Sequence, residues 1–450
     1  MAGGFARVVL PVVMATVAAC GGAEPTSSPA TPATPTTAVT QPPPAPSPSA
    51  TASPRTSLDS PTQARIAFLV QRVQADPDDG DAQLELGLAL LQRIRETADP
   101  SLYGPAEKAL TAARRLLPND PNPLVGLGGL QLGRHQFGVA LRTGRAALRL
   151  DPASVGAASI EVDALIELGR YDEAFPAAEK LAARAPNLTT LSRLSYTREL
   201  RGDVPGALEA MRTAAASPSG AAENTSFALS IVGHLERLSG DATAARAAYE
   251  QALGLVPDHA PSLTGLGRLA VGEGDLDGAA SIFERAAAIL PLPEYVIALG
   301  EVHDAADDLS DARRQYDLAA AEIGLYQANG VAVDLDLALF ETDHGDPARA
   351  LDLARAAYRA APTVRAADAL AWCLHHAGDN AAAKVSSDEA LRLGSRDPLF
   401  LYHAGVIAMA LNDPATARDR LGTALAADPG FSATGVRAAR SILGVLGAAS

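Results

Sequence analysis

Small apolar residues recur along this chain at a nearly constant spacing. The segment Gly169–Ala174, which reads Gly-Arg-Tyr-Asp-Glu-Ala, has counterparts at Gly202–Ala207, Gly240–Ala245 and Gly274–Ala279. Extended to equivalent positions, the column comprises Ala106, Ala140, Ala174, Ala207, Ala245, Ala279, Ala312, Ala350, Ala383 and Ala417. Neighbouring members are 33 or 34 residues apart, except for two intervals of 38. A period of 34 residues is typical of a helix–turn–helix repeat.

Two further columns keep the same register. Twelve residues before the alanine, glycine stands at Gly128, Gly233, Gly267, Gly300 and Gly405. Twelve residues after it, proline stands at Pro118, Pro152, Pro186, Pro257, Pro291, Pro362 and Pro429. Recurrent glycine inside a helix indicates that two backbones touch there, and proline after the second helix prevents its continuation. The Gly-Asp turn between the helices permits a positive φ and then places a carboxylate near the next helix start.

The two longer intervals predict local departures from the repeat. Residues 322–328 continue the second helix of one unit by about one turn, with Asn329-Gly330 as its C-terminal cap. Residues 217–220, which read Ser-Pro-Ser-Gly, predict a longer loop instead. Helices at 61–74 and 433–447 would cap the array, because the terminal units of a repeat protein need a face that tolerates water.

The pattern resembles the tetratricopeptide-repeat family over roughly residues 78–431. It departs from the family in three places: leucine replaces the early aromatic of the first helix, the first unit carries extra residues before Ala106, and Val162 stands where a small residue is expected. The resemblance implies an all-α fold, an α-solenoid wound as a right-handed superhelix of about ten repeats with capping helices. We expect this solenoid to occupy residues 61–450, with the C-terminal cap at 432–450.

The N-terminus predicts export. An apolar run follows Arg7 from Val8 to Ala19, too short to span a bilayer and typical of a signal peptide over residues 1–19. Small residues precede Cys20, an arrangement that resembles the bacterial lipoprotein box, in which the cysteine is acylated. We therefore expect an anchor on the outer face of the cell membrane. The alternative is an ordinary secretory signal followed by a chance cysteine.

Residues 20–60 predict a disordered tether behind the anchor. From Gly21 to Ser60, 10 residues are proline and 15 are serine or threonine, so this segment buries too little apolar surface to fold. A plain linker is the simpler interpretation, and a proline-motif ligand is the alternative.

Composition restricts the possible partners. The formal charge of −15 argues against nucleic acid, which needs a basic face. Arginine makes up all but three of the 37 basic residues, a bias typical of GC-rich bacteria such as actinobacteria.

The sequence contains none of the common catalytic motifs. It lacks a Gly-rich phosphate loop, a Gly-x-Ser-x-Gly elbow and a His-Glu-x-x-His motif. Cys373 lies in an apolar stretch and is interpreted as a buried structural thiol. Adjacent His375 and His376 diverge on a helix, so they do not form a metal site together. We expect no enzyme activity, cofactor or metal.

In the resembling family, the first helices of successive repeats line a concave groove that holds peptides or partner helices. The register places Asp163, Glu167, Glu301, Asp304, Leu339 and His376 on this face. The residues that we select there as candidate partner contacts are Tyr196, Glu199, His234, Arg237, Arg268, Arg365, Asp368, Trp372, His375 and Tyr402.

Trp372, the only tryptophan, is the most specific of these candidates. Arg365, Asp368, Trp372 and His375 fall on one face of an ideal helix, and tryptophan, tyrosine and arginine are enriched at binding hot spots. The alternative is that the indole packs between repeats.

These observations favour a membrane-anchored extracytoplasmic scaffold that binds partner proteins or peptides in its groove, with a role in cell-envelope assembly. Two alternatives stay open. One is a non-catalytic recognition subunit of an exported enzyme complex. The other is an extracytoplasmic small-ligand binder, which an open groove serves poorly.

Overall fold

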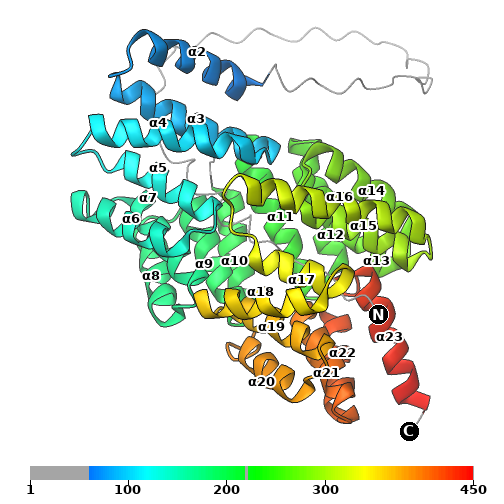
Figure 1. The fold of residues 1–450 in the computed structure, drawn as a ribbon. Coiled ribbons are helices and arrows are strands. Elements are labelled where there is room, and N and C mark those ends of the chain that lie inside the picture. The colour runs from blue at the N-terminus through cyan, green and yellow to red at the C-terminus, as the bar shows by residue number, and fades with distance from the viewer. Residues whose placement is uncertain (1–59, 218–220, 449–450) are drawn as a thin grey trace, which may run out of the picture.

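The computed structural model describes residues 60–217 and 221–448. These residues form α-helices, one 3-10 turn (η3, Pro100–Leu102) and connecting loops, with no strand among them. No helix in these ranges is both long and apolar enough to cross a membrane. The expected all-α solenoid is confirmed, and Figure 1 shows its helices stacked in chain order.

Twenty of the helices form ten consecutive antiparallel pairs, and each pair is one repeat. The pairs are α3 (Gly80–Thr97) with α4 (Tyr103–Leu116), α5 (Asn122–Gly133) with α6 (Phe137–Leu150), α7 (Val155–Glu167) with α8 (Tyr171–Arg184), α9 (Leu188–Leu200) with α10 (Val204–Ala216), α11 (Ala222–Leu238) with α12 (Ala242–Leu255), α13 (Ala260–Glu273) with α14 (Leu276–Ile289), α15 (Pro293–Ala305) with α16 (Leu309–Ala328), α17 (Asp334–His344) with α18 (Pro347–Ala360), α19 (Val364–His376) with α20 (Asn380–Ala390), and α21 (Pro398–Ala410) with α22 (Pro414–Ala427). Two further helices, α2 (Pro61–Ala75) and α23 (Ala433–Ala448), flank these pairs.

The alanine column lies where the helices of each repeat meet. All ten alanines are at most 2% exposed. Four of the five glycines in the column pack against bulky residues of the second helix: a Cβ at Gly267 would lie 2.9 Å from the Phe283 ring and one at Gly300 2.5 Å from the Tyr316 ring. The repeat therefore alternates small and large residues across each helix contact, which allows close packing without voids.

The turns within the repeats behave as the Gly-Asp pattern predicts. Gly274 has a φ of +82°, a conformation that glycine adopts without steric cost. The Asp275 side chain then accepts a hydrogen bond from the Gly278 amide at 2.9 Å and caps α14. At the other end of a repeat, Pro291 stands two residues after the last residue of α14, where the missing amide stops the helix.

One of the two long intervals is a lengthened helix, as predicted. Helix α16 has 20 residues, ends at Ala328 and is followed by Gly330 with a φ of +79°. At the other interval, α10 ends at Ala216 and the 17-residue α11 begins at Ala222. Residues 218–220 of the predicted loop lie outside the described residues. Val162 is 1% exposed inside α7, so the larger side chain is accommodated in the core.

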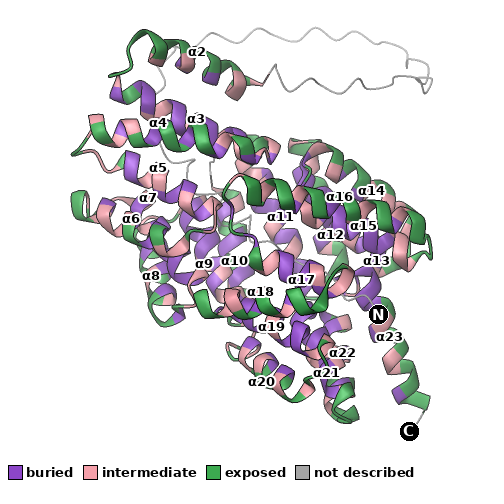
Figure 2. Cartoon of the chain, viewed as in Figure 1, coloured by how far each residue is buried: buried purple, intermediate pink, exposed green. Residues whose placement is uncertain are grey.

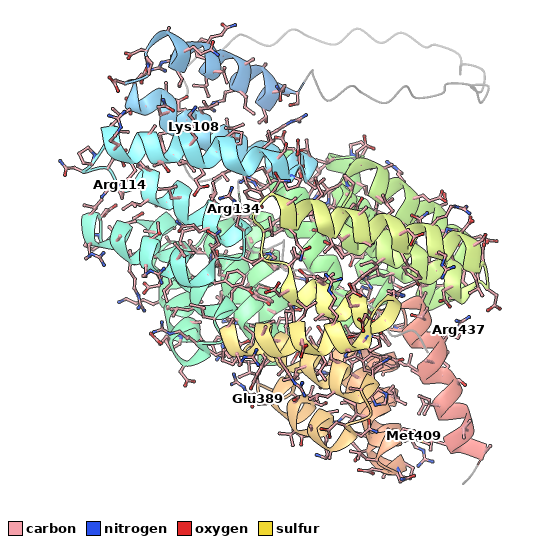
Figure 3. The ribbon with its side chains drawn as sticks, viewed as in Figure 1. Lys108, Arg114, Arg134, Glu389, Met409 and Arg437 are labelled. Atoms are coloured by element: carbon pink, nitrogen blue, oxygen red, sulfur yellow. The ribbon has the colours of Figure 1, made fainter. Side chains whose placement is uncertain are left out.

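The solenoid doubles back on itself. We call α2–α16 arc 1 and α17–α23 arc 2. The Val364 amide at the start of α19 donates a hydrogen bond to the Tyr171 hydroxyl at the start of α8, at 3.0 Å, and the Ala332 amide donates to the carbonyl of Arg134 at 3.1 Å. Arg134 is labelled in Figure 3, beside the segment that enters α17. Contacts between residues about 190 positions apart thus hold arc 2 along arc 1.

The distribution of buried and exposed residues follows from the packing of the two arcs. Exposed residues gather on second helices such as α14, α16 and α18, whereas the first helices are mostly buried (Figure 2). The concave side of the solenoid is therefore largely enclosed by the chain itself.

Candidate ligand pocket between the two arcs

A pocket of about 230 Å³ lies between the two arcs. Most of its wall comes from the first helices α9, α11, α13 and α15 of arc 1, and the remainder comes from α19, the α20–α21 connection and α21 of arc 2. Its lining residues from arc 2 are Arg365, Ser395, Arg396, Asp397 and Phe400. The concave face of arc 1 is thus covered by arc 2.

Six of the ten candidate contacts selected from the sequence line this pocket. They are Tyr196, Glu199, His234, Arg237, Arg268 and Arg365. They come from α9, α11, α13 and α19, so these six side chains face one cavity. The lining residues of the α20–α21 connection were missed, because the repeat pattern carries no signal for which distant loop covers the groove.

A chain of polar contacts crosses one wall of the pocket. His234 Nε2 lies 3.2 Å from Glu199 Oε1, and His234 Nδ1 lies 3.2 Å from Arg237 Nη2. Arginine only donates, so Nδ1 accepts and Nε2–H donates to the carboxylate, which assigns a neutral imidazole here. Arg237 also forms a buried ion pair with Asp428 of arc 2. Both side chains are at most 7% exposed.

Two other arginines of the pocket lie close to oxygen atoms of arc 2. Arg268 donates a hydrogen bond to the carbonyl of Phe431, and an Arg365 nitrogen lies 3.9 Å from an Asp336 oxygen. Burial raises the pKa of Glu294 to about 8, so this carboxyl is mostly protonated at neutral pH. Its Oε2 is buried without a hydrogen-bond partner.

Apolar and aromatic side chains complete the lining. The lining includes Phe227 and Ile231 of α11, Tyr295 of α15 and Phe400 of α21. Burial raises the pKa of Tyr196 well above its usual value, so its phenol stays neutral. An apolar cavity with a few oriented polar groups is the usual form of a site that binds a side chain or a small molecule.

The other four candidate contacts do not reach the pocket. Trp372 and Tyr402 are 2% and 3% exposed, so the expectation that they lie on an open groove face is wrong. The indole stacks on the His403 ring at a centroid distance of 4.1 Å, and its Nε1 donates to Asp343 at 2.8 Å. The alternative interpretation, packing between repeats, agrees with this geometry.

Asp368 and His375 belong to the same cluster around the indole. Asp368 is 2% exposed, and its Oδ2 lies 2.9 Å from His403 Nδ1, while burial raises the pKa of the carboxyl. His375 stacks beside Trp372 and lies 2.6 Å from the Asn380 side chain. These side chains stabilise the contact between α19 and α21.

Several other positions projected onto the groove are also internal. Asp163 forms a buried ion pair with Arg193, and Glu301 and Leu339 are 2% and 8% exposed. Burial raises the pKa of Glu167 to about 7. First-helix positions thus face either the pocket or the neighbouring repeat, which the repeat register alone does not separate.

Two further sites bring reactive or metal-ligating side chains together. Cys373 is fully buried beside Thr342, and burial raises the pKa of its thiol to about 12, in agreement with a structural role. In the described ranges, His303, Asp308 and Asp311 form the one cluster with ligand atoms within 4.8 Å of one another. Asp308 already caps α16, which accounts for its position. Cys20 and the proline-rich segment lie outside the described residues.

Comparison with known proteins gives a family for the repeats. Residues 125–189 and 237–296 each match a family model of the tetratricopeptide repeat. The crystal structure of the APC/C hetero-tetramer Cut9–Hcn1 is similar at 13% identity, over 84% of this chain and 93% of that chain, with a TM-score of 0.37. A tetratricopeptide repeat protein from Parabacteroides merdae is similar at 17% identity, over 58% of this chain and 98% of that one, with a TM-score of 0.33. No curated protein matches the sequence. Residues 125–189 and 237–296 are thus tetratricopeptide repeats by their sequence, and the stacked helix pairs around them continue the same all-α solenoid.

Proposed function

We propose that this protein is a non-catalytic scaffold that binds a partner protein by receiving one of its side chains or a short segment in the pocket between the arcs. The observation that carries the proposal is the convergence of polar and aromatic side chains from four repeats of arc 1 on one cavity. Tetratricopeptide repeats are protein-binding modules, and the pocket lies on the side that the family uses for peptides. Its opposed charges favour a partner group that has both a hydrogen-bond donor and an acceptor.

A variant that fills the pocket tests this proposal. Ile231 is a partly buried lining residue, and Ile231→Trp places a large ring in the cavity. Leu318→Trp adds the same ring on the outer face of α16, where the leucine is 48% exposed, and serves as the control. Crosslinking and affinity capture from intact membranes should recover a partner with the wild type and Leu318→Trp but not with Ile231→Trp. Equal recovery with both variants would place the partner site elsewhere.

We further propose that the scaffold is anchored to the outer face of the cell membrane through acylated Cys20, with residues 21–60 as a tether and a role in cell-envelope assembly. The small residues before Cys20 and the short apolar run support this location. Cys20→Ser should release the protein from the membrane or leave it unprocessed. Unchanged membrane partitioning of that variant would refute the anchor.

A second candidate function is the binding of a small extracytoplasmic ligand. The observation that favours it is that the pocket is covered by arc 2, unlike the open groove expected from the sequence. A thermal-shift screen against metabolites would detect it. A compound that raises the melting temperature of the wild type and Leu318→Trp, but not of Ile231→Trp, would support this function and would account for a failure to capture any protein.

A further inference from the structure

The pocket between the arcs has a lining rich in aromatic side chains. Phenylalanine, tyrosine and tryptophan make up only 4% of the protein. Five such residues nevertheless line this one cavity: Tyr196, Phe227, Tyr249, Tyr295 and Phe400. Grooves lined by aromatic rings are the usual binding sites of proline-rich segments, because proline rings pack on the flat aromatic faces. An extended proline-rich backbone forms no internal hydrogen bonds, so a hydroxyl group such as that of Ser195 in the lining can donate to its carbonyl oxygens.

Most charged side chains of the lining are already engaged with other groups of the protein. Glu199 contacts His234 at 3.2 Å, and Arg237 forms its buried ion pair with Asp428. Arg268 donates a hydrogen bond to a backbone carbonyl of arc 2. A charged ligand would lose its hydration without gaining a new counter-charge from these groups. The lining therefore favours an uncharged ligand.

The chain itself contains a segment with matching properties. Residues 42–48 read Pro-Pro-Pro-Ala-Pro-Ser-Pro, with five prolines and no charged residue. Sequences of this kind favour the polyproline II conformation, which aromatic grooves recognise. The segment lies outside the described residues. Its chemistry suits the aromatic, charge-compensated lining of the pocket.

The described chain begins close to this pocket. Ser60, the first described residue, accepts a hydrogen bond from Arg93 of α3 at 3.1 Å. Ala98, directly after α3, belongs to one buried apolar cluster with the lining residues Leu292 and Tyr295. Arg93 and Ala98 are separated by about 8 Å of helix, so with the length of the arginine side chain Ser60 lies within roughly 25 Å of the pocket wall.

The end of the pocket nearest to Ser60 is open. Phe227, Pro261 and Glu294 stand near the N-terminal ends of α11, α13 and α15, and each is a partly exposed lining residue. Glu294 adjoins Tyr295, which packs in the cluster described above, so this end faces the start of the described chain. A segment that enters here reaches the aromatic rings while the two arcs stay in contact.

We propose that residues 42–48 of the chain bind in this pocket, where their proline rings pack on the aromatic lining, and that a partner protein has to displace them. Residues 49–59 connect the segment to Ser60, and in an extended form they span about 34 Å, more than the distance to the pocket wall. A ligand tethered at this length has an effective concentration on the order of 1 mM, so even a weak contact fills the pocket. Displacement by a partner rests on the proposed function, whereas occupancy by residues 42–48 does not.

Photo-crosslinking of the full-length protein tests the proposal. The photoreactive residue 4-benzoylphenylalanine replaces Phe227 in the pocket or, as a control, Leu318 on the outer face of α16. Leu318 is 48% exposed and stands in α16 two turns before Tyr326, whose hydroxyl donates to the Ala98 carbonyl at 3.0 Å. Both positions are therefore within similar reach of the segment, and only the first lies in the pocket.

We expect crosslinks from position 227 to residues 42–48, located by mass spectrometry, with a yield about fivefold or more above that from position 318. They should fall to the control level in a variant that combines Pro42→Ser, Pro43→Ser, Pro44→Ser and Pro46→Ser. They should persist in the matched variant that combines Pro25→Ser, Pro29→Ser, Pro32→Ser and Pro35→Ser. Both sets of substitutions lie outside the described helices, so the pocket itself is unaltered.

Two results would overturn the proposal. One is equal crosslinking from positions 227 and 318, or equal yields in the two proline variants. The other is a crosslinked dimer in denaturing electrophoresis, which would show that a second copy of the chain supplies the segment.

Partner capture separates this inference from the proposed function. Because residues 42–48 compete with the partner, the variant that lacks the prolines at 42–46 should capture about twofold more partner, or better, than the matched variant. Crosslinks from position 227 together with undiminished capture by Ile231→Trp would keep the self-occupied pocket and refute the pocket as the partner site. Absent crosslinks together with lost capture by Ile231→Trp would do the reverse.

Discussion

Tyr249 of α12 lies in a slot formed by glycines of the two neighbouring first helices. The ring is 2% exposed. A Cβ on Gly233 of α11 would lie 2.6 Å from its Cε1, and one on Gly265 of α13 would lie 2.2 Å from its Cζ. We predict that Gly233→Ala destabilises the protein, because a methyl group in this slot must displace a buried ring.

The magnitude follows from a matched control. Gly254→Ala alters an exposed position of α12 with no atom within 4 Å, so it only gains helix propensity, about 0.5–1 kcal/mol. Gly233→Ala gains the same amount but adds the overpacking penalty, typically about 1–3 kcal/mol. The free energy of unfolding should therefore be lower for Gly233→Ala than for Gly254→Ala by about 1–3 kcal/mol.

Urea unfolding followed by circular dichroism at 222 nm measures this difference. Repeat arrays can unfold in stages, so a single urea transition does not locate the loss of stability. Hydrogen exchange of the amides in α11–α13 should therefore be measured as well, and it should be faster in Gly233→Ala. Replacing the ring by a smaller side chain, as in Gly233→Ala with Tyr249→Leu, should recover part of the stability and yield a coupling energy of about 0.5–3 kcal/mol. Equal stability of the two alanine variants would refute the tight slot.

Three further outcomes are expected. Asp428→Asn leaves the buried Arg237 without its counter-ion and should lower the free energy of unfolding by about 3–5 kcal/mol in a urea titration. The control Asp388→Asn removes an exposed ion pair and should lower it by less than about 1 kcal/mol. Burial lowers the pKa of His259 to about 4, so the unfolded chain binds more protons and stability should fall by up to about 3 kcal/mol as pH drops from 6.5 to 4. His259→Gln should flatten this part of the stability profile, and an unchanged profile would contradict the assignment. The emission of Trp372 should be blue-shifted and resistant to acrylamide, and red-shifted, quenchable emission would show that the indole is exposed.

The sequence alone was sufficient to determine the repeat. Its 34-residue period, the buried alanines and the prolines after seven of the ten second helices all describe contacts within a repeat or between neighbours, and such contacts recur along the array. The Gly-Asp turns and the longer α16 are local for the same reason. The register also identified the side of arc 1 that faces the pocket, because one helix face repeats from unit to unit.

Only the tertiary structure decided which of those faces stay open. Small rotations between successive repeats accumulate over about 190 residues before Val364 meets Tyr171, and no single repeat encodes their sum. The same geometry separates two candidates that look equivalent in sequence. Arg365 lines the pocket, whereas Trp372, seven positions later on the same helix, packs on His403 of the next repeat. A first helix touches both the groove and its neighbour, so burial there depends on how the arcs close.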